Sequence, residues 1–364
     1  MLSRVAEAIY WMGRYAERAE NVARFVDVSF QVMLDLPEPL GDPWAGVVGA
    51  TGDEALYAAR HGTATRDGVV RFLTFDAGSP NSILSCLRKA RENARSVREV
   101  ISSEMWEQIN KWYLLVRDAS TDQAVLDDPH DFLTEVKQAS HLFVGIAALT
   151  MSHGEGWHFG RIGRLLERAD QTSRIVDAKQ ALLLARPSEL GASLDEINLS
   201  ALLRSVSALE MYRKRHGRIA FQTVIGFLLL EKMFPRSVRY CLNEARRSLH
   251  AITGQPPEAG DTIVPERLLG RLGAEYEYAS VDEVLAEGLH EHLDRLQSKL
   301  NEVGLAISQT FFAVRPHVQE PPAARTAAPA PETAAAVAAQ TTAAGPVAAA
   351  SPPAPAPQPT GAAQ

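Results

Sequence analysis

A 15-residue pattern occurs twice in this chain, at residues 13–27 and again at residues 163–177. Both copies read G-R-x-x-E-R-A-(E/D)-(N/Q)-x-x-R-x-V-D. The glycine, the arginines and the first glutamate are identical in the two copies, whereas the apolar residues between them differ. A repeat that only fills a core would be expected to keep shape rather than charge. The pattern therefore indicates that the charged side chains have a role of their own.

A second pair of similar segments follows the two copies. Residues 69–76 and 80–83 resemble residues 224–231 and 235–238. The offset is 150 residues for the first motif and 155 for these segments, so the second half carries about five extra residues. We predict a tandem duplication of a unit of about 150 residues, a longer period than that of solenoid repeats. Two such units are expected to pack as pseudo-symmetric halves of one body.

The spacing of apolar residues predicts an all-α fold. Over residues 3–34 they recur every three or four positions, as on one face of a helix, and no convincing alternating strand pattern appears. Over residues 289–307 a heptad spacing of leucine, valine and isoleucine predicts a helix that needs a neighbour along its length. We therefore expect a helical bundle. Further helices are expected at about 67–76, 81–100, 103–119, 131–153, 158–185, 200–215, 219–233, 237–252, 265–275 and 281–314.

Composition divides the chain into two parts. We assign residues 1–318 to the helical domain, with a first repeat of about 1–155 and a second of about 156–318. Of the last 45 residues, 19 are Ala and 10 are Pro, and only three are charged. Such a segment cannot bury enough apolar surface to offset its ordering entropy. Residues 319–364 are therefore predicted to be a disordered tail, and Pro187 and Gly191 are expected to interrupt the helices.

Charge and composition exclude several classes of protein. The net charge is −7 without a dense Lys/Arg block, which argues against nucleic-acid binding. No apolar run is long enough to span a membrane, and no secretory signal pattern is seen, so a cytoplasmic protein is expected. The two cysteines, Cys86 and Cys241, are interpreted as buried packing residues, with a redox or nucleophilic role as the alternative.

The first motif places charges at the border of an apolar helical face. Glu17, Glu20 and Arg24 lie beside the apolar stripe, whereas Arg14 and Arg18 project toward another side. Partly buried charges must be paired or bound to a ligand. The spacing of Glu20 and Arg24 allows an i,i+4 ion pair, but Arg14 and Arg18 are like charges at that spacing and need partners elsewhere.

The second motif repeats this arrangement, and Gly13 and Gly163 add to it. A glycine inside a helix costs about 1 kcal/mol relative to alanine, so both positions indicate the close approach of a neighbouring helix or ligand. If the two motif helices face each other, their charges form one polar centre. The candidate binding centre comprises Arg14, Glu17, Arg18, Glu20, Arg24, Arg164, Glu167, Arg168, Asp170 and Arg174.

Three interpretations of this centre remain open. The first is a buried ion-pair network that fixes helix register. The second is a binding or catalytic cleft for a charged or amide-bearing substrate. The third is a dinuclear metal site. Carboxylate bundles that bind two metals usually add Glu-x-x-His ligands, which are missing here, so no metal is predicted. No cofactor is predicted either, because the chain lacks a phosphate loop, a dinucleotide fingerprint, zinc-ligand spacing and a nucleophile elbow. Any ATP chemistry is then expected to belong to a partner.

Weaker candidates lie outside the motif helices. They share a polar or titratable side chain next to a turn or in a polar-aromatic cluster. These candidates are Asp76, Glu231, Glu104, Asn110, His153 and His158.

Residues 2–21, LSRVAEAIYWMGRYAERAEN, resemble the bacterial alpha-E domain family, which is named for helices with a Glu-Arg motif. The resemblance continues through residues 81–83, 90–95, 103–106 and 110, and resumes at 163–170 and 235–238, covering roughly residues 1–315. One departure is Glu231, where an Asp like Asp76 would be expected. The resemblance implies an all-helical fold without an established activity. It also implies an accessory part of gene clusters that encode an ATP-grasp ligase and a transglutaminase-like cysteine protease.

These observations lead to one leading hypothesis and two alternatives. The leading hypothesis is a helical accessory or binding protein of an ATP-grasp peptide or amide ligase system, whose Glu-Arg centre binds a peptide, an amide or a partner. Its expected partners are the ligase and the transglutaminase-like protein, with no nucleic acid and no membrane. The first alternative is an enzyme acting on an amide or peptide bond, with Glu17 or Glu167 as general acid or base. The second is a purely structural interaction module.

Overall fold

The computed structural model describes residues 1–35, 43–49, 51–184, 192–254 and 263–313. These residues form helices and connecting turns without a β-strand, as the apolar spacing predicts. The predicted disordered tail, residues 319–364, and the break at Pro187 and Gly191 lie outside the described residues. Contacts group residues 1–315 into one compact unit.

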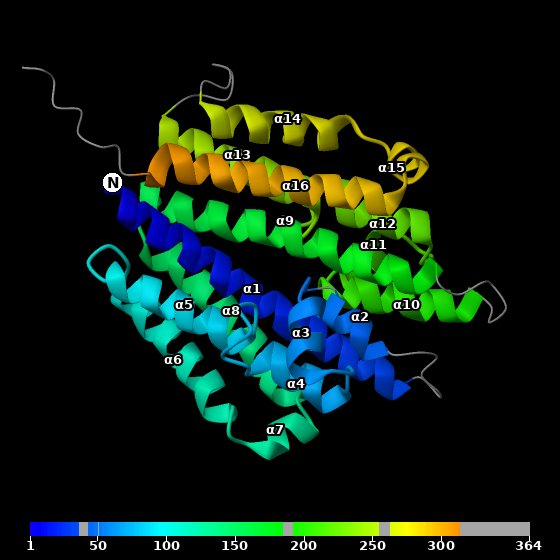
Figure 1. Cartoon of the computed structure of the whole chain (residues 1–364). Coiled ribbons are helices and arrows are strands. Elements are labelled where there is room, and N and C mark those ends of the chain that lie inside the picture. The colour runs from blue at the N-terminus through cyan, green and yellow to red at the C-terminus, as the bar shows by residue number, and fades with distance from the viewer. Residues whose placement is uncertain (36–42, 50, 185–191, 255–262, 314–364) are drawn as a thin grey trace, which may run out of the picture. The chain divides into compact units, whose positions relative to one another are not determined.

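The first part of the chain contains nine helices among the described residues (Figure 1). They are α1 (Ser3–Asp35), α2 (Pro43–Gly49), α3 (Glu54–His61), α4 (Arg66–Thr74), α5 (Ile83–Ser96), α6 (Ser103–Ala119), α7 (Gln123–Asp127), α8 (His130–Thr150) and α9 (Glu155–Leu184). The rest are α10 (Ala192–Ser205), α11 (Leu209–Arg215), α12 (Phe221–Leu230), α13 (Val238–Thr253), α14 (Val264–Tyr278), α15 (Val281–Glu287) and α16 (Leu289–Ile307). A π-helical turn, Ser308–Phe312, follows α16.

The two motif helices, α1 and α9, lie against each other at the centre of this unit (Figure 1). On one side α5 and α8 pack on α1, and α6 covers both of them. On the other side α13 and α16 pack on α9, and α14 covers both. Buried apolar side chains from all of these helices form one continuous core. The motif charges therefore lie between the layers rather than on an outer face.

Glycines allow α1 and α9 to approach closely. A Cβ atom on Gly13 would lie within 3.3 Å of three backbone atoms of Gly160. A Cβ atom on Gly163 would overlap the carbonyl oxygen of Tyr10 and lie 3.1 Å from its carbonyl carbon. A side chain at either position would push the helices apart. The glycines thus fix the crossing from which the motif side chains on each helix reach the other helix.

Serines start the helices that follow each Pro-x-Ser segment. The hydroxyl of Ser82 accepts a hydrogen bond from the backbone N–H of Ser85, and that of Ser237 accepts one from Tyr240, both at 3.1 Å. Each serine is therefore an N-cap that satisfies a donor left free by the first helical turn. These caps fix the start of α5 and α13, and with them the placement of Asn81 and Arg236 immediately before each cap.

Two predicted helices are wrong in extent. The single helix expected at 281–314 is divided into α15 and α16, because Gly288 adopts φ 102°, a conformation that side chains rarely allow, and it ends in the π-helical turn. The heptad residues of this segment all fall in α16, which packs on α9 and α14 as expected. The helix expected at 200–215 is interrupted at Ser207, whose φ is 52°, giving α10 and α11.

None of the helices in the described part of the chain is both long enough and apolar enough to cross a membrane.

Candidate functional site

Glu167 on α9 is held by two arginines of α1. Its Oε2 accepts a hydrogen bond from Arg14 Nε at 2.9 Å, and Arg18 donates to both carboxylate oxygens, from Nε at 2.6 Å and from Nη2 at 3.0 Å. Gln171 Nε2 adds a fourth donor at 3.1 Å. Burial by itself raises the pKa of the Glu167 carboxyl, but the Arg18 and Arg14 guanidinium groups lower it to about 2. The carboxylate is therefore ionised and fully engaged.

Glu17 on α1 is held in the reverse direction. Arg168 on α9 donates to both of its carboxylate oxygens at 2.7 Å, and Asn21 Nδ2 donates to Oε1 at 3.1 Å. Arg236, which immediately precedes the N-cap of α13, donates to Oε1 at 3.4 Å. Burial raises the pKa of Glu17, but the Arg168 and Arg236 cations bring it below its ordinary value. The i,i+3 pairing of Arg14 with Glu17 that their spacing allows is replaced by pairing across the two helices.

The remaining acidic residues of the motifs pair along their own helices. Glu20 receives an ion pair from Arg24, and Asp170 Oδ2 accepts from Arg174 Nε at 2.8 Å, so both i,i+4 pairs are present. Glu20 also accepts from Arg236 Nη2 at 2.7 Å. The second oxygen of Asp170, Oδ1, is buried and has no hydrogen-bond partner among the described residues. Both oxygens of the Glu20 carboxylate thus accept hydrogen bonds, whereas only one oxygen of the Asp170 carboxylate does so among the described residues.

Arg164 is the motif arginine that stays apart from this network. Among the residues that the structure describes, it has no hydrogen-bond or ion-pair partner, although it corresponds to Arg14 in the sequence. It lines an apolar cavity of about 20 Å³ with Met105 and Trp157. Burial, together with the nearby Arg168 cation, lowers the pKa of Arg164 to about 10. Beside Glu17 the second arginine is Arg236, which bonds Oε1, whereas beside Glu167 it is Arg14, which bonds the other oxygen, Oε2.

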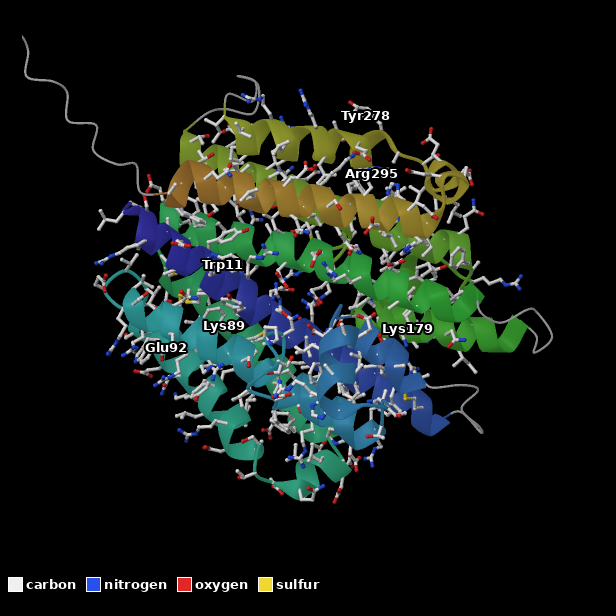
Figure 2. The ribbon with its side chains drawn as sticks, in the orientation of Figure 1. Trp11, Lys89, Glu92, Lys179, Tyr278 and Arg295 are labelled. Atoms are coloured by element: carbon white, nitrogen blue, oxygen red, sulfur yellow. The ribbon has the colours of Figure 1, made fainter. Side chains whose placement is uncertain are left out.

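The outer side of the Arg14 guanidinium packs on aromatic rings. It lies 5.4 Å from the ring centroid of Trp11, which is labelled on α1 in Figure 2, and 5.9 Å from that of Tyr10. Arg18 lies 6.0 Å from the ring centroid of Tyr15. Such contacts hold an arginine in place while its nitrogens serve a carboxylate. They add to the contacts that hold Arg14 and Arg18 beside Glu167.

A polar cavity of about 220 Å³ lies beside the Glu167 side of the network. Arg18, Asp170, Gln171 and Arg174 contribute polar groups to its wall. Asn81, before the N-cap of α5, closes one side: its Oδ1 accepts from Arg18 Nη1 at 2.8 Å, and its Nδ2 donates to both oxygens of Asp53 at 3.0 and 3.1 Å. The complete lining is Arg18, Val22, Thr51, Gly52, Asn81, Asp170, Gln171 and Arg174.

This geometry bears on the three interpretations of the centre. A general base should have a pKa near the working pH, whereas Glu17 and Glu167 are both shifted downward and enclosed by donors. The general acid or base role of these two residues is therefore not favoured. In the described ranges, no group of three or more His, Cys, Asp or Glu side chains is arranged to hold a metal ion. Ion pairing explains why Glu17 and Glu167 are buried and ionised. The polar cavity beside Glu167 is the place with room for a ligand.

The weaker candidates make contacts elsewhere. Asp76 pairs with Arg60 at 3.1 Å and Glu231 with Arg215 at 2.7 Å, each beside the turn before a Pro-x-Ser segment. None of the six is hydrogen-bonded or ion-paired with a residue of the candidate binding centre in the part of the chain that the structure describes. The others contact local partners: Glu104 contacts Ser103, Asn110 accepts from Arg91, His153 stacks on Trp157, and His158 packs edge-on to Trp157.

Both cysteines are free and buried, as packing residues are. Burial raises the pKa of the Cys86 and Cys241 thiols to about 12. A thiol with such a pKa is almost entirely protonated at neutral pH and is a poor nucleophile. The redox or nucleophilic alternative is not favoured.

Sequence reasoning missed several residues of the site. Arg236, Asn81 and Asp53 were outside the candidate set, although Arg236 bonds to three residues of the first motif. The signal was present, since the 155-residue offset aligns Asn81 with Arg236, and a polar residue thus precedes the N-cap in both halves. Lys179, labelled in Figure 2, is a buried titratable residue outside the cavity lining; burial lowers its pKa to about 8, and it lies 5.7 Å from the ring centroid of Phe25.

Comparisons with known proteins give the following matches. The Alpha-E family model, described as a predicted alpha-helical domain with a conserved ER motif, matches residues 1–312. An uncharacterized protein of Mycobacterium bovis is 27% identical over 338 residues, which is 85% of this chain and 37% of the relative. Uncharacterized proteins of two Mycobacterium tuberculosis strains match over the same shares at 27% and 26% identity. The chain therefore spans little more than a third of the length of these relatives. No solved structure matches significantly.

Proposed function

The chain belongs to the Alpha-E family, and on that premise we propose that it is a helical accessory protein of an ATP-grasp peptide or amide ligase system. In this proposal it works in the cytoplasm with the ligase and a transglutaminase-like protein. The ion pairs between α1 and α9 hold the helices in register, and the cavity beside them binds a charged or amide-bearing ligand. The chain itself supplies no nucleotide motif, so the ATP chemistry belongs to the ligase.

The observation that carries the binding role is a buried, unsatisfied carboxylate oxygen of Asp170, a residue that lines the 220 Å³ cavity. Asp170 is 6% exposed, yet its Oδ1 has no hydrogen-bond partner among the described residues. An unpaired buried charged group is costly, so such an oxygen is expected to bind water or a ligand. Arg174, on the same wall, uses only Nε in its bond to Asp170, which leaves its two terminal nitrogens for further partners. Acceptor and donors together suit a peptide or amide.

The length of the relatives supports an accessory role. The matched segment makes up 37% of the Mycobacterium bovis relative, so in that protein an Alpha-E unit shares its polypeptide with a larger amount of other chain. A unit that shares a polypeptide with other segments in a relative supports a role beside partners. The family resemblance names the ligase and the transglutaminase-like protein as those partners.

The proposal also treats the chain as two pseudo-symmetric tandem repeats. Contacts in the two halves support this view at the same 155-residue offset. The Ser82 hydroxyl donates to the carbonyl oxygen of Asp76, and the Ser237 hydroxyl donates to that of Glu231. Two ring stacks recur as well: Tyr57 with His61 at 5.0 Å and Tyr212 with His216 at 4.8 Å between centroids. Duplication explains why two separate segments supply reciprocal arginines and glutamates.

The proposal is tested by affinity capture of the tagged full chain from its native host. Mass spectrometry then identifies both co-purifying proteins and molecules released on denaturation. The wild-type chain is compared with Arg174→Met, which changes the cavity, and with Arg24→Met, which removes the corresponding i,i+4 arginine outside it. We expect all three chains to capture an ATP-grasp protein, and only Arg174→Met to lose a released molecule by fivefold or more.

Two results would contradict this expectation. Capture without any ATP-grasp protein argues against the partner, and equal recovery of released molecules from all three chains argues against the cavity as the binding site. Circular dichroism of each variant establishes that it is folded before capture.

A further inference from the structure

One half of the protein already contains a bound guanidinium group, supplied by its own Arg236. The Arg236 side chain donates to Glu17 Oε1 at 3.4 Å, to Asn21 Oδ1 at 2.8 Å and to Glu20 Oε2 at 2.7 Å. Its side chain is 11% exposed. Three acceptors from one face of α1 thus surround a planar cation, which is the arrangement that guanidinium groups prefer.

The corresponding position in the other half is Asn81, whose side chain is too short to reach the same place. It bonds instead to Arg18 and Asp53, and the space is the 220 Å³ cavity. The acceptors that correspond to those of Arg236 are Glu167, Asp170 and Gln171. Asp170 and Gln171 line the cavity. The two halves therefore differ at corresponding positions. In one half the Arg236 side chain fills the place beside the acceptors, and in the other half that place is the open cavity.

The open place retains the acceptors for a cation. Asp170 Oδ1, which corresponds to the Glu20 oxygen bound by Arg236, is buried and without a hydrogen-bond partner in the described part of the chain. Gln171 uses Nε2 to bond Glu167, as Asn21 uses Nδ2 to bond Glu17. Its Oε1 corresponds to the Asn21 oxygen that accepts from Arg236. From this correspondence we infer that the cavity binds the guanidinium group of an incoming ligand in the place that Arg236 fills in the other half.

The local charges allow an additional cation despite the nearby arginines. On the filled side, Arg24, Arg168 and Arg236 face Glu17 and Glu20, and the nearby Arg164 adds a further cation, so the balance is two positive charges. On the open side, three arginines face three carboxylates and the balance is neutral. These groups are Arg14, Arg18 and Arg174 with Glu167, Asp170 and Asp53. A bound guanidinium would bring the open side to one net positive charge, which is less than the filled side already carries.

The inference rests on the proposed binding role of the cavity and specifies its ligand class. The source of the guanidinium is either a free small molecule or an arginine side chain of a peptide. Agmatine represents the first, and an N-acetylated, amidated Gly-Arg-Gly peptide the second. Sodium acetate probes the opposite possibility, an anion bound by Arg18 and Arg174.

The experiment measures the thermal unfolding midpoint of the full chain with each probe at constant ionic strength. For the wild-type protein we expect agmatine or the peptide to raise the midpoint by about 2–4 °C at ten times its dissociation constant. The variant Asn81→Arg supplies a cation from the chain, so its response to these probes should disappear. The variant Arg236→Asn opens the second place, so its midpoint should fall and its response to agmatine should exceed that of the wild type.

The outcomes separate this inference from the proposed function. A response of the wild-type chain to either guanidinium probe, lost in Asn81→Arg, supports the inference and names the source. If Asn81→Arg does not fold, Asp170→Asn replaces it, because it removes the charge that a guanidinium needs. A response to acetate without a response to agmatine or the peptide overturns the guanidinium assignment and leaves the cavity as a binding site. No response to any probe, while Arg236→Asn does respond to agmatine, overturns it as well.

Discussion

Replacing Glu167 by glutamine tests whether the ion pairs between α1 and α9 stabilise the fold. The wild-type carboxylate is fully buried and accepts four N–H donors, three of them from Arg14 and Arg18. Glutamine keeps the size of the side chain and removes its charge. The two arginines, whose side chains are 13% and 20% exposed, would then lack their counter-charge. We expect a large loss of stability without a change in helix content.

Two routes give the same magnitude for this loss. The pKa of Glu167 falls from 4.5 to about 2 because the arginines outweigh the effect of burial. At 1.36 kcal/mol per unit, this shift corresponds to about 3 kcal/mol of stabilisation. Removing one partner of a buried ion pair costs roughly 3–5 kcal/mol in proteins generally. Glu167→Gln should therefore lower the free energy of unfolding by about 3 kcal/mol at pH 7.

The same reasoning fixes the pH dependence of the loss. A carboxyl whose pKa is lower in the folded state stabilises the protein above its unfolded pKa, and this contribution disappears as the pH falls. The gap between the wild type and Glu167→Gln should narrow from about 3 kcal/mol at pH 7 to about 1 kcal/mol at pH 3. Glu17 and Glu20 are present in both proteins, so their own titration largely cancels in this comparison.

The assay is urea unfolding followed by circular dichroism between pH 7 and pH 3. The control is Glu92→Gln, since Glu92 is 46% exposed and pairs with arginines at the surface, where such pairs contribute little. Its effect should stay within about 0.5 kcal/mol. A loss below about 1 kcal/mol for Glu167→Gln at pH 7, or a gap that does not depend on pH, would refute the stabilising role of the ion pairs.

Two further substitutions test the helix crossing and the unpaired arginine. Gly163→Ala should lower the free energy of unfolding by about 2 kcal/mol or more, because the added methyl group would overlap the Tyr10 carbonyl. The control Gly145→Ala, whose methyl group meets no atom within 4 Å, should raise the free energy of unfolding by up to about 1 kcal/mol. Equal effects of the two variants in urea unfolding would contradict the close crossing of α1 and α9. Arg164→Met should raise the free energy of unfolding by about 1 kcal/mol, because burial opposes a charge that has no partner among the described residues. Arg14→Met should lower the free energy of unfolding by about 3 kcal/mol, because Arg14 is bonded to Glu167. A loss of stability in both variants would show that Arg164 is paired.

The helical fold follows from the sequence because apolar spacing records which face of each helix is buried. The helix expected at 103–119 has the bounds of α6, and the helix expected at 237–252 corresponds to α13, Val238–Thr253. Breaks within a helical pattern are harder to predict. Gly288 looks like a tolerated helix glycine in the sequence, and only its φ of 102° shows that the chain turns there. Local preference does not determine such a position, since tertiary packing decides it.

The candidate site was predictable only in part. The motif shows that buried arginines need counter-charges, but the identity of each partner depends on where α1 and α9 cross. The motif glycines predict a close approach of a neighbouring helix or ligand, but the sequence does not show that Gly13 meets Gly160 and that Gly163 meets Tyr10. The cavity was not predictable, because the segment around Gly52 and the residue Asn81 complete it from a distance in the sequence.

The structural and binding interpretations of the Glu-Arg centre apply to different atoms of the same network. Glu17 and Glu167 are enclosed by donors, and a fully satisfied buried network gives rigidity and register. Among the described residues of the network, Asp170 Oδ1 and Arg24 Nε are buried without a hydrogen-bond partner, and of these two residues Asp170 lines the cavity. Departures from local consistency tend to occur where a protein binds or reacts. Because Asn81 stands where the other half has Arg236, Asp170 lacks the donor that Arg236 gives to Glu20. A ligand is therefore expected where the two halves differ, on a framework that their shared charges hold in place.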